Sequence, residues 1–239
     1  MKVLVLGAHG QIGQLLVKKL QHSAFDVVCG LRSPKQVEDY QAQGYNSVLV
    51  DVEKDMAQLQ RAMQDIQAVV FAVGSGGKTG ADKTMMVDLD GAVKAIEAAK
   101  NMSVPRFLLV SAIGSQNREL WSYGQRNLST GNYYYAAKYY ADIWLKNSNL
   151  DYTIIRPALL VNDAPQGQID LAPNLELEVA GKVRTITRSD VAETIVECLK
   201  QPNTIKQSFD LSNGSTLLRR RSQIYNNKIK LKIIRAEIF

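Results

Sequence analysis

Tyr134 and Lys138 lie four residues apart in a helical pattern, which places both side chains on one face of a helix. A free tyrosine has a pKa of about 10 and is a poor base at neutral pH. A neighbouring ammonium group stabilises the phenolate and lowers that pKa, so the pair suits proton transfer. The spacing is common by chance, and its position after the fifth predicted strand is what singles it out.

A glycine-rich segment near the N-terminus is the second candidate for chemistry. Gly7, Gly10 and Gly13 follow a short apolar run and precede a helical pattern. Gly7 permits a tight turn, Gly10 lets the backbone approach a diphosphate, and Gly13 lets helix and strand pack closely. The first turn of that helix offers free N–H groups to an anion, so the spacing predicts a dinucleotide site. The same loop contains His9, Gln11 and Ile12.

The end of the second predicted strand indicates which dinucleotide binds. An acidic residue there would accept hydrogen bonds from the ribose 2′-hydroxyl and repel a 2′-phosphate. This chain has Arg32 and Ser33 instead, and a guanidinium with a hydroxyl suits a phosphate. We therefore expect NADP(H) in preference to NAD(H).

Short β-branched runs alternate with helical patterns along the chain. Strands are predicted at residues 2–6, 26–31, 47–50, 68–73, 106–110 and 152–156. Met86, Leu89, Val93 and Ile96 form one apolar stripe on a predicted helix around residues 82–100, and Thr187–Asp190 is a capping box for a last helix. This alternation predicts an α/β fold: a single Rossmann-type domain over residues 1–217, with a doubly wound parallel sheet in a three-layer αβα arrangement.

Motifs along most of the chain point to one family. They are the glycine loop, Leu31-Arg32-Ser33, Asp51-Val52, residues 88–92 and 96–99, Val110-Ser111, residues 134–138, Ile155-Arg156-Pro157 and residues 188–192. Together they are similar to the short-chain dehydrogenase/reductase superfamily and resemble its atypical, NAD(P)H-binding, NmrA-like or epimerase-like members. The resemblance covers residues 1 to about 217.

The resemblance implies roles for single residues. Asp51, followed by Val52, would contact the adenine amine. Lys138 would hold the nicotinamide ribose hydroxyls, and Tyr134 would donate a proton to a carbonyl oxygen while NADPH delivers hydride to the carbon. The loop beside the cofactor riboses would be Ala72, Val73 and Gly74.

Two positions depart from the family's full active site. The family places a serine after the fifth strand, commonly the second of a Ser-Ser pair, where this chain has Ser111-Ala112. Ser111 or Ser115 could supply the hydroxyl; without it a donor to the developing alkoxide is lost, at a cost on the order of 100-fold in rate. Asp88 stands where the extended branch has an active-site Asn, as is typical of the atypical subgroup. The candidate catalytic set is Tyr134, Lys138, Ser111 and Asp88.

The substrate is expected to meet residues 120–132 and 158–171, because both segments follow strands. Trp121 and Tyr123 could stack on a flat quinone or flavin, or pack as part of a lid. The length leaves little room for the larger domain that binds nucleotide sugars in longer relatives, so we expect reduction of a small carbonyl, quinone or flavin. An NADP(H)-sensing, NmrA-like regulatory protein and a sugar epimerase or dehydratase are the alternatives.

Composition argues against several other classes. Hydrophobic residues make up 46% of the 239 residues and charged residues 22%, as in ordinary globular proteins. No apolar run approaches the roughly 18 residues of a membrane helix. The two histidines and two cysteines form no ligand cluster, so no metal site is expected. We expect a cytoplasmic monomer or homodimer whose partners are a dinucleotide and a small-molecule substrate, not a membrane.

The net charge of +6 belongs to the end of the chain. Residues 1–214 hold 22 basic and 22 acidic residues, whereas residues 215–239 hold seven basic residues and one acidic residue. Residues 218–239 are therefore predicted to be an atypical basic tail, either an exposed strand or a disordered arm. Because the rest of the chain is formally neutral, nucleic acid is not an expected partner.

Overall fold

The computed structural model describes residues 1–77, 79–122 and 132–217. Two predictions fall outside the described residues. They are the basic tail at 218–239 and most of the expected substrate segment at 120–132, including Tyr123. The remaining predictions can be compared with the fold.

One sheet of nine strands runs through the described part of the chain, in the order β13-β8-β12-β6-β5-β4-β1-β2-β3. The strands from β3 to β12 in this order are parallel. At the far edge β8 runs antiparallel to both of its neighbours, β12 and β13. Their bounds are β1 Lys2–Leu6, β2 Asp26–Leu31, β3 Ser47–Leu49, β4 Ala68–Phe71, β5 Arg106–Val110, β6 Asp151–Pro157, β8 Gln168–Ala172, β12 Gln207–Asn213 and β13 Thr216–Leu217.

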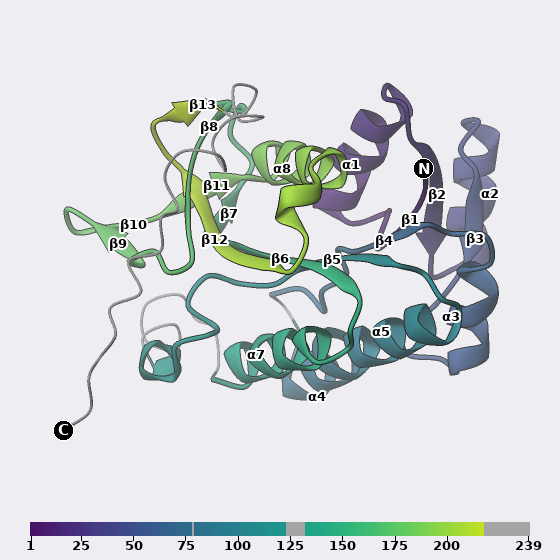
Figure 1. Cartoon of the computed structure of the whole chain (residues 1–239), viewed down its shortest axis with the longest axis horizontal. Helices are drawn as coiled ribbons and strands as arrows, with labels where there is room; N and C mark the ends of the chain where they lie inside the picture. The colour runs from purple at the N-terminus through teal and green to yellow at the C-terminus, as the bar shows by residue number, and fades with distance from the viewer. Residues whose placement is uncertain (78, 123–131, 218–239) are drawn as a thin grey trace.

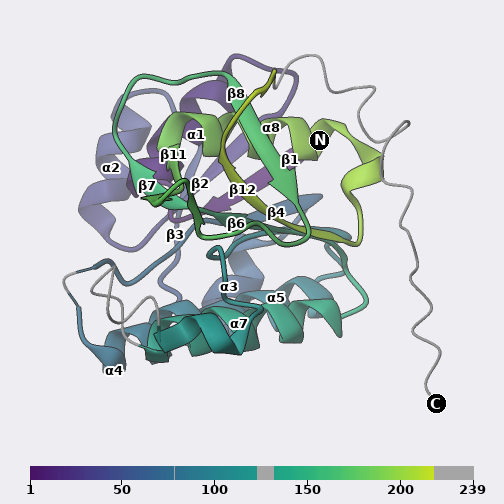
Figure 2. The same ribbon diagram turned by 90° about the vertical axis from the view of Figure 1, so that its left-hand side faces the viewer.

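Helices cover both faces of this sheet (Figures 1 and 2). One face carries α1 (Gln11–Gln21), α2 (Pro34–Ala42) and α8 (Arg188–Lys200). The other carries α3 (Met56–Ala62), α5 (Gly91–Asn101) and α7 (Asn132–Lys146). The chain is thus an α/β protein with a Rossmann-type doubly wound sheet in three layers, as the alternation of strands and helices predicted.

Local sequence explains where these helices begin. Ser33 caps α2 by accepting a hydrogen bond from Gln36 N–H, and Pro34 stands at the first helical position. Thr187 caps α8 in the same way through Asp190 N–H, which confirms the capping box. Each helix then buries one apolar stripe, such as Leu16 and Leu20 of α1, against the sheet.

The predicted helix over residues 82–100 is three segments. A short α4 (Ala81–Lys83) continues into a π-helix at Thr84–Asp90, called the π segment below, and then into α5. The prediction that Met86 shares one stripe with Ile96 is wrong, because the wider π-helical turn changes the register: Met86 is 44% exposed and Ile96 is fully buried. The π segment buries Val87 and Asp88 instead.

Several short strands after residue 157 were not predicted from the sequence. β7 (Leu159–Val161) pairs in parallel with β11 (Thr185–Thr187), and β9 (Glu178–Val179) forms a hairpin with β10 (Lys182–Val183). Most other strand and helix boundaries lie within one or two residues of the predicted ones. The fourth strand, for example, ends at Phe71 and not at residue 73. Within the described residues no helix combines the length and apolarity that a membrane crossing requires.

Candidate functional site

The glycine loop between β1 and α1 has the geometry of a phosphate cradle. Gly7 adopts φ +86°, and a Cβ placed there would lie 2.8 Å from Ala72 O. A Cβ on Gly13 would collide with Gly7 O, so α1 can pack this closely only with glycine at that position. Gly10 stands at the N-cap of α1 without a side-chain cap, which leaves the N–H groups of the first helical turn free for a ligand.

A cleft of 500 Å³ opens over this loop at the carboxyl ends of β1, β2, β3 and β4. Most of the predicted cofactor residues line it: Gly7, His9, Gly10, Gln11, Ile12, Arg32, Asp51, Val52, Ala72, Val73 and Gly74. Three of the predicted cofactor residues do not line the cleft: Lys138, Gly13 and Ser33. Gly13 lies in the contact between α1 and the loop, and the Ser33 hydroxyl is engaged in capping α2.

Several residues line the cleft without having been predicted. Lys83 does so, and its ammonium pairs with the Glu53 carboxylate at 2.7 Å. Leu160 and Arg188 reach the cleft from the C-terminal half of the chain. The segment containing Arg188 was noticed only as a helix cap and a family motif, so its position over the cleft needed the tertiary structure.

The predicted catalytic helix brings Lys138 against Asp88 of the π segment. Lys138 Nζ lies 2.9 Å from Asp88 Oδ1, and both side chains are at least 95% buried. Ser75 N–H donates to Asp88 Oδ2 at 3.0 Å, so the carboxylate also touches the loop that lines the cleft. Lys138 Nζ further donates to Val110 O at 3.4 Å, at the end of β5. The ion pair therefore joins the π segment, α7 and the carboxyl ends of two strands.

The two partners of this ion pair keep each other charged. Burial raises the pKa of Asp88, but the Lys138 ammonium and the hydrogen bonds from Ser75 outweigh it, and the net pKa is lowered. Burial lowers the pKa of Lys138, yet Asp88 and Tyr134 raise it well above its usual range. Because both shifts favour the ionised forms, the pair is a fixed local dipole at neutral pH.

Tyr134 lies beside this pair, with its ring centroid 5.7 Å from Lys138 Nζ. Lys138 lowers the pKa of Tyr134, as expected, but the net pKa is raised. Burial raises the pKa of Tyr134 above 10, Asp88 raises it further, and the opposing effect of Lys138 does not offset the two. Tyr134 is therefore held as a neutral phenol, the form that can donate a proton.

Ser111 and Ser115 are both buried after β5. Burial raises the pKa of the Asp142 carboxyl, and the nearby Ser111 hydroxyl partly opposes this, although no well-formed hydrogen bond joins the two groups. Ser115 Oγ likewise has no hydrogen-bond partner among the described residues. The position that the family fills with a second serine is the buried Ala112.

Trp121 is engaged in packing. Its indole N–H donates to Ser115 O at 2.9 Å, its ring meets Tyr139 edge-on at 5.8 Å, and Arg118 lies over it at 5.4 Å. Of the two readings of this residue, these contacts favour the packing role over stacking on a substrate.

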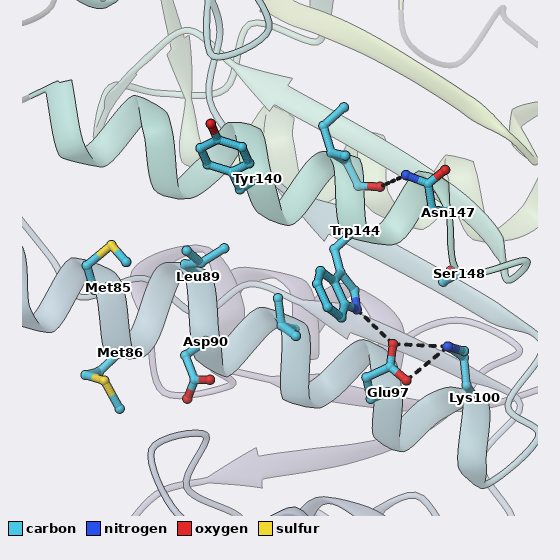
Figure 3. A pocket seen from close by; sticks show the side chains of 12 residues that line it. Met85, Met86, Leu89, Asp90, Glu97, Lys100, Tyr140, Trp144, Asn147 and Ser148 are labelled. Carbon is cyan, nitrogen blue, oxygen red and sulfur yellow. Dashed lines mark hydrogen bonds and ion pairs between the residues drawn. The ribbon is translucent and has the colours of Figure 1, made fainter.

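A second hollow lies on the outer side of the π segment. It is a groove of 790 Å³ between the π segment with α5 and the facing side of α7. Figure 3 shows Met85 and Met86 at one end of it and the Trp144 indole near the other, donating to Glu97 at 2.8 Å. Asp88 and Lys138 do not line this groove, so it is separate from the ion pair. In the described part of the chain no cluster of His, Cys, Asp or Glu could hold a metal ion.

Comparison with known proteins agrees with this geometry. A family model described as NAD(P)H-binding matches residues 7–202. The Bacillus subtilis (strain 168) protein named "Uncharacterized sugar epimerase YhfK" is 41% identical over 217 residues, covering 90% of this chain and 96% of that protein.

Solved structures give the same result. A chain from Bacillus halodurans, described as a candidate NAD-dependent epimerase/dehydratase, superposes with a TM-score of 0.82 at 37% identity, covering 92% of this chain and 97% of that one. A short-chain dehydrogenase/reductase from Veillonella parvula in complex with NADP shares the fold, with a TM-score of 0.69 at 20% identity over 90% of this chain and 96% of that one.

Proposed function

The chain belongs to the NAD(P)H-binding family of atypical, epimerase-like short-chain dehydrogenases/reductases, and from this membership we propose that it is an NADPH-dependent reductase of a small carbonyl, quinone or flavin. The observation that carries the proposal is the buried Asp88–Lys138 pair, 2.9 Å apart, with the Tyr134 phenol beside it and the glycine cleft on its other side.

The cleft suits a dinucleotide. Gly7 and Gly13 stand where a Cβ would strike backbone atoms, so the loop is free of side chains at the point where a diphosphate would approach. Asp51 would accept a hydrogen bond from the adenine amine, and the loop from Ala72 to Gly74 would flank the riboses. Arg32, exposed at the rim of the cleft, would bind the 2′-phosphate and so favour NADP(H) over NAD(H).

When bound, the reduced nicotinamide supplies the hydride that this chain cannot. Lys138 would hold the hydroxyls of the neighbouring ribose and, through its charge, stabilise negative charge that develops on the substrate oxygen. Tyr134 would donate its phenolic proton to that oxygen, so that a carbonyl receives one hydride and one proton and becomes an alcohol. Asp88 would position Lys138 by fixing its ammonium group.

The protonation state of Tyr134 is compatible with its proposed role as an acid. A base must be deprotonated before it acts, whereas an acid must hold its proton until the substrate oxygen becomes basic. Because burial and Asp88 together raise the pKa of Tyr134, the phenol keeps the proton that reduction of a carbonyl would consume.

A regulatory protein that senses NADP(H) is the second candidate. Ala112 occupies the position of the family's catalytic serine, and the Ser111 hydroxyl lies near Asp142. A site that lacks this hydroxyl would bind the dinucleotide and turn over slowly or not at all. A sugar epimerase is the third, suggested by the name of the Bacillus subtilis relative.

The three candidates separate in one set of assays. NADPH binding is measured by titration calorimetry, and NADPH oxidation is then followed with quinones, flavins and aldehydes, beside an epimerisation assay on nucleotide sugars. The proposal expects micromolar NADPH binding and turnover with at least one acceptor of the first three classes. Tight binding without turnover on any acceptor identifies the regulator, and epimerisation without net NADPH oxidation identifies the epimerase.

A further inference from the structure

Arg188 is a cation of the cleft without an acidic partner. It is the first residue of α8, lines the cleft with Leu160, and is half-buried. Its Nη1 donates to Asn162 Oδ1 at 2.8 Å, and among the described residues it pairs with no carboxylate. Lys83, another cation that lines the cleft, is by contrast already paired with Glu53 at 2.7 Å.

The charge of Arg188 is therefore uncompensated in the free protein. Burial lowers the pKa of its guanidinium, and no neighbouring acid opposes that effect. Removing a cation from water without supplying a counter-charge costs stability. A bound anion would remove that cost, because the guanidinium has a planar set of donors that matches the oxygens of a phosphate.

The backbone around Arg188 is held in place by the hydrogen bonds of neighbouring residues. Thr187 caps α8, and its own N–H donates to Asn213 Oδ1 at 3.0 Å. Asp190, two residues on, accepts hydrogen bonds from Gln166 N–H and Gly167 N–H at 2.9 and 3.0 Å. Arg188 and Asp190 together thus tie residues 162–167 to the start of α8, which places the guanidinium before any ligand arrives.

The glycine loop indicates which anion Arg188 would meet. Gly10 and Arg188 line the same cleft, and α1 lies beside α8, with Lys19 of α1 paired to Glu193 of α8 at 2.7 Å. We propose that Arg188 is a phosphate-binding residue that closes the dinucleotide site from the C-terminal half of the chain. The inference rests on the proposed function and extends it by a residue and by a link to residues 162–167.

Arg188 could contact either of two groups of the dinucleotide, the diphosphate or the 2′-phosphate. Nucleotides that carry only one of these groups distinguish the two cases. Wild type, Arg188→Gln and Arg188→Lys are titrated with NADPH, ADP and 2′-AMP, with Lys182→Gln as a control that removes an exposed charge of the β9–β10 hairpin. Contact with the diphosphate predicts at least about 10-fold weaker binding of NADPH and ADP to Arg188→Gln and unchanged binding of 2′-AMP. Contact with the 2′-phosphate predicts weaker binding of NADPH and 2′-AMP and unchanged binding of ADP.

Two further measurements separate a ligand role from a structural one. The ligand-free Arg188→Gln protein should unfold at the same temperature as wild type or higher, because the variant removes an uncompensated charge. NADPH should protect the amides of residues 162–167 from hydrogen exchange in wild type and not in Arg188→Gln. Arg188→Lys, which keeps the charge and loses the planar fork, should bind with intermediate affinity.

The outcomes that overturn the inference are distinct from failure of the proposed function. If wild type binds NADPH, and Arg188→Gln binds each of the three probes as tightly as wild type does, Arg188 contacts no phosphate. A lower unfolding temperature of the ligand-free variant would make Arg188 a structural residue. If wild type binds neither NADPH nor ADP, the proposed function itself fails.

Discussion

Lys138 Nζ lies 2.9 Å from Asp88 Oδ1, and this contact joins the π segment to the helix that carries Tyr134. The pair is almost fully excluded from water. The contact holds two elements that are far apart in the sequence against each other. Burial lowers the pKa of Lys138, and Asp88 and Tyr134 together outweigh that effect.

Removing one partner of the ion pair should lower the free energy of unfolding more than removing both partners. Lys138→Met leaves Asp88 buried without its counter-charge, and we expect the free energy of unfolding to fall by about 3–5 kcal/mol. The double variant Lys138→Met/Asp88→Asn removes both charges and should recover most of that loss. Urea denaturation of both variants measures the difference. Equal stability of single and double variants would show that the pair does not behave as a unit.

The cofactor preference should depend on Arg32. Arg32→Ala removes the proposed 2′-phosphate ligand, so we expect NADPH to bind about 10- to 100-fold more weakly and NADH to bind as before. Lys35→Ala, which removes another exposed charge at the start of the next helix, is the matched control and should change neither affinity. Unchanged NADPH affinity in Arg32→Ala would contradict the assignment.

The close approach at Gly13 should tolerate no side chain. Gly13→Ala places a methyl group against Gly7 O, so either α1 or the loop must move. We expect a loss of about 1–3 kcal/mol in stability together with weaker NADPH binding. Gly77→Ala is the control, since a Cβ there meets open space, and it should be nearly neutral by both measures. A Gly13→Ala variant with wild-type stability and affinity contradicts the packing argument.

Asp210 should make stability depend on pH. It is fully buried on β12 and accepts hydrogen bonds from Gln116 Nε2 and Leu175 N–H. Burial raises its pKa to about 6, with Asp142 adding to this, while Leu175, Gln116 and Arg156 oppose it. The folded state therefore holds a proton that the unfolded state releases between pH 4 and pH 6. This contribution to stability grows as the pH falls through 6 and is complete below about pH 4.

Asp210→Asn tests this linkage. The stability difference between wild type and the variant should shift in favour of wild type by up to about 1.4 kcal/mol for each pH unit between 6 and 4. Asp163→Asn, at an exposed position, should show no such shift. A difference that stays constant from pH 7 to pH 4 would show that Asp210 does not titrate in this range.

Sequence patterns were sufficient for the six strands β1 to β6 and for most of the residues that line the cleft over the glycine loop, because both depend on local signals. The glycine spacing acts within seven residues, and β-branched runs bounded by turns define the parallel strands. The same holds for the Thr187–Asp190 cap.

Features that depend on tertiary contacts could not be predicted in this way. The π segment interrupts a pattern that reads as one continuous helix, so Met86 was assigned to the stripe of Ile96 while Asp88 is what faces Lys138. The net pKa of Tyr134 depends on tertiary contacts in the same way. The spacing of four residues correctly indicates that Lys138 lowers this pKa, but it cannot show that burial and the charge of Asp88 raise it further. Arg188 reaches the cleft only because α8 packs beside α1.

The most direct test of the account compares kcat of Tyr134→Phe with that of Tyr133→Phe on the best acceptor found in the NADPH oxidation assays. Tyr133 is exposed and one residue away, so its variant controls for loss of a phenol from the same helix. If Tyr134 donates the proton, kcat of Tyr134→Phe should fall at least about 100-fold with NADPH affinity unchanged, while Tyr133→Phe stays near wild type. Equal kcat values for the two variants would contradict the assignment of Tyr134 as the proton donor.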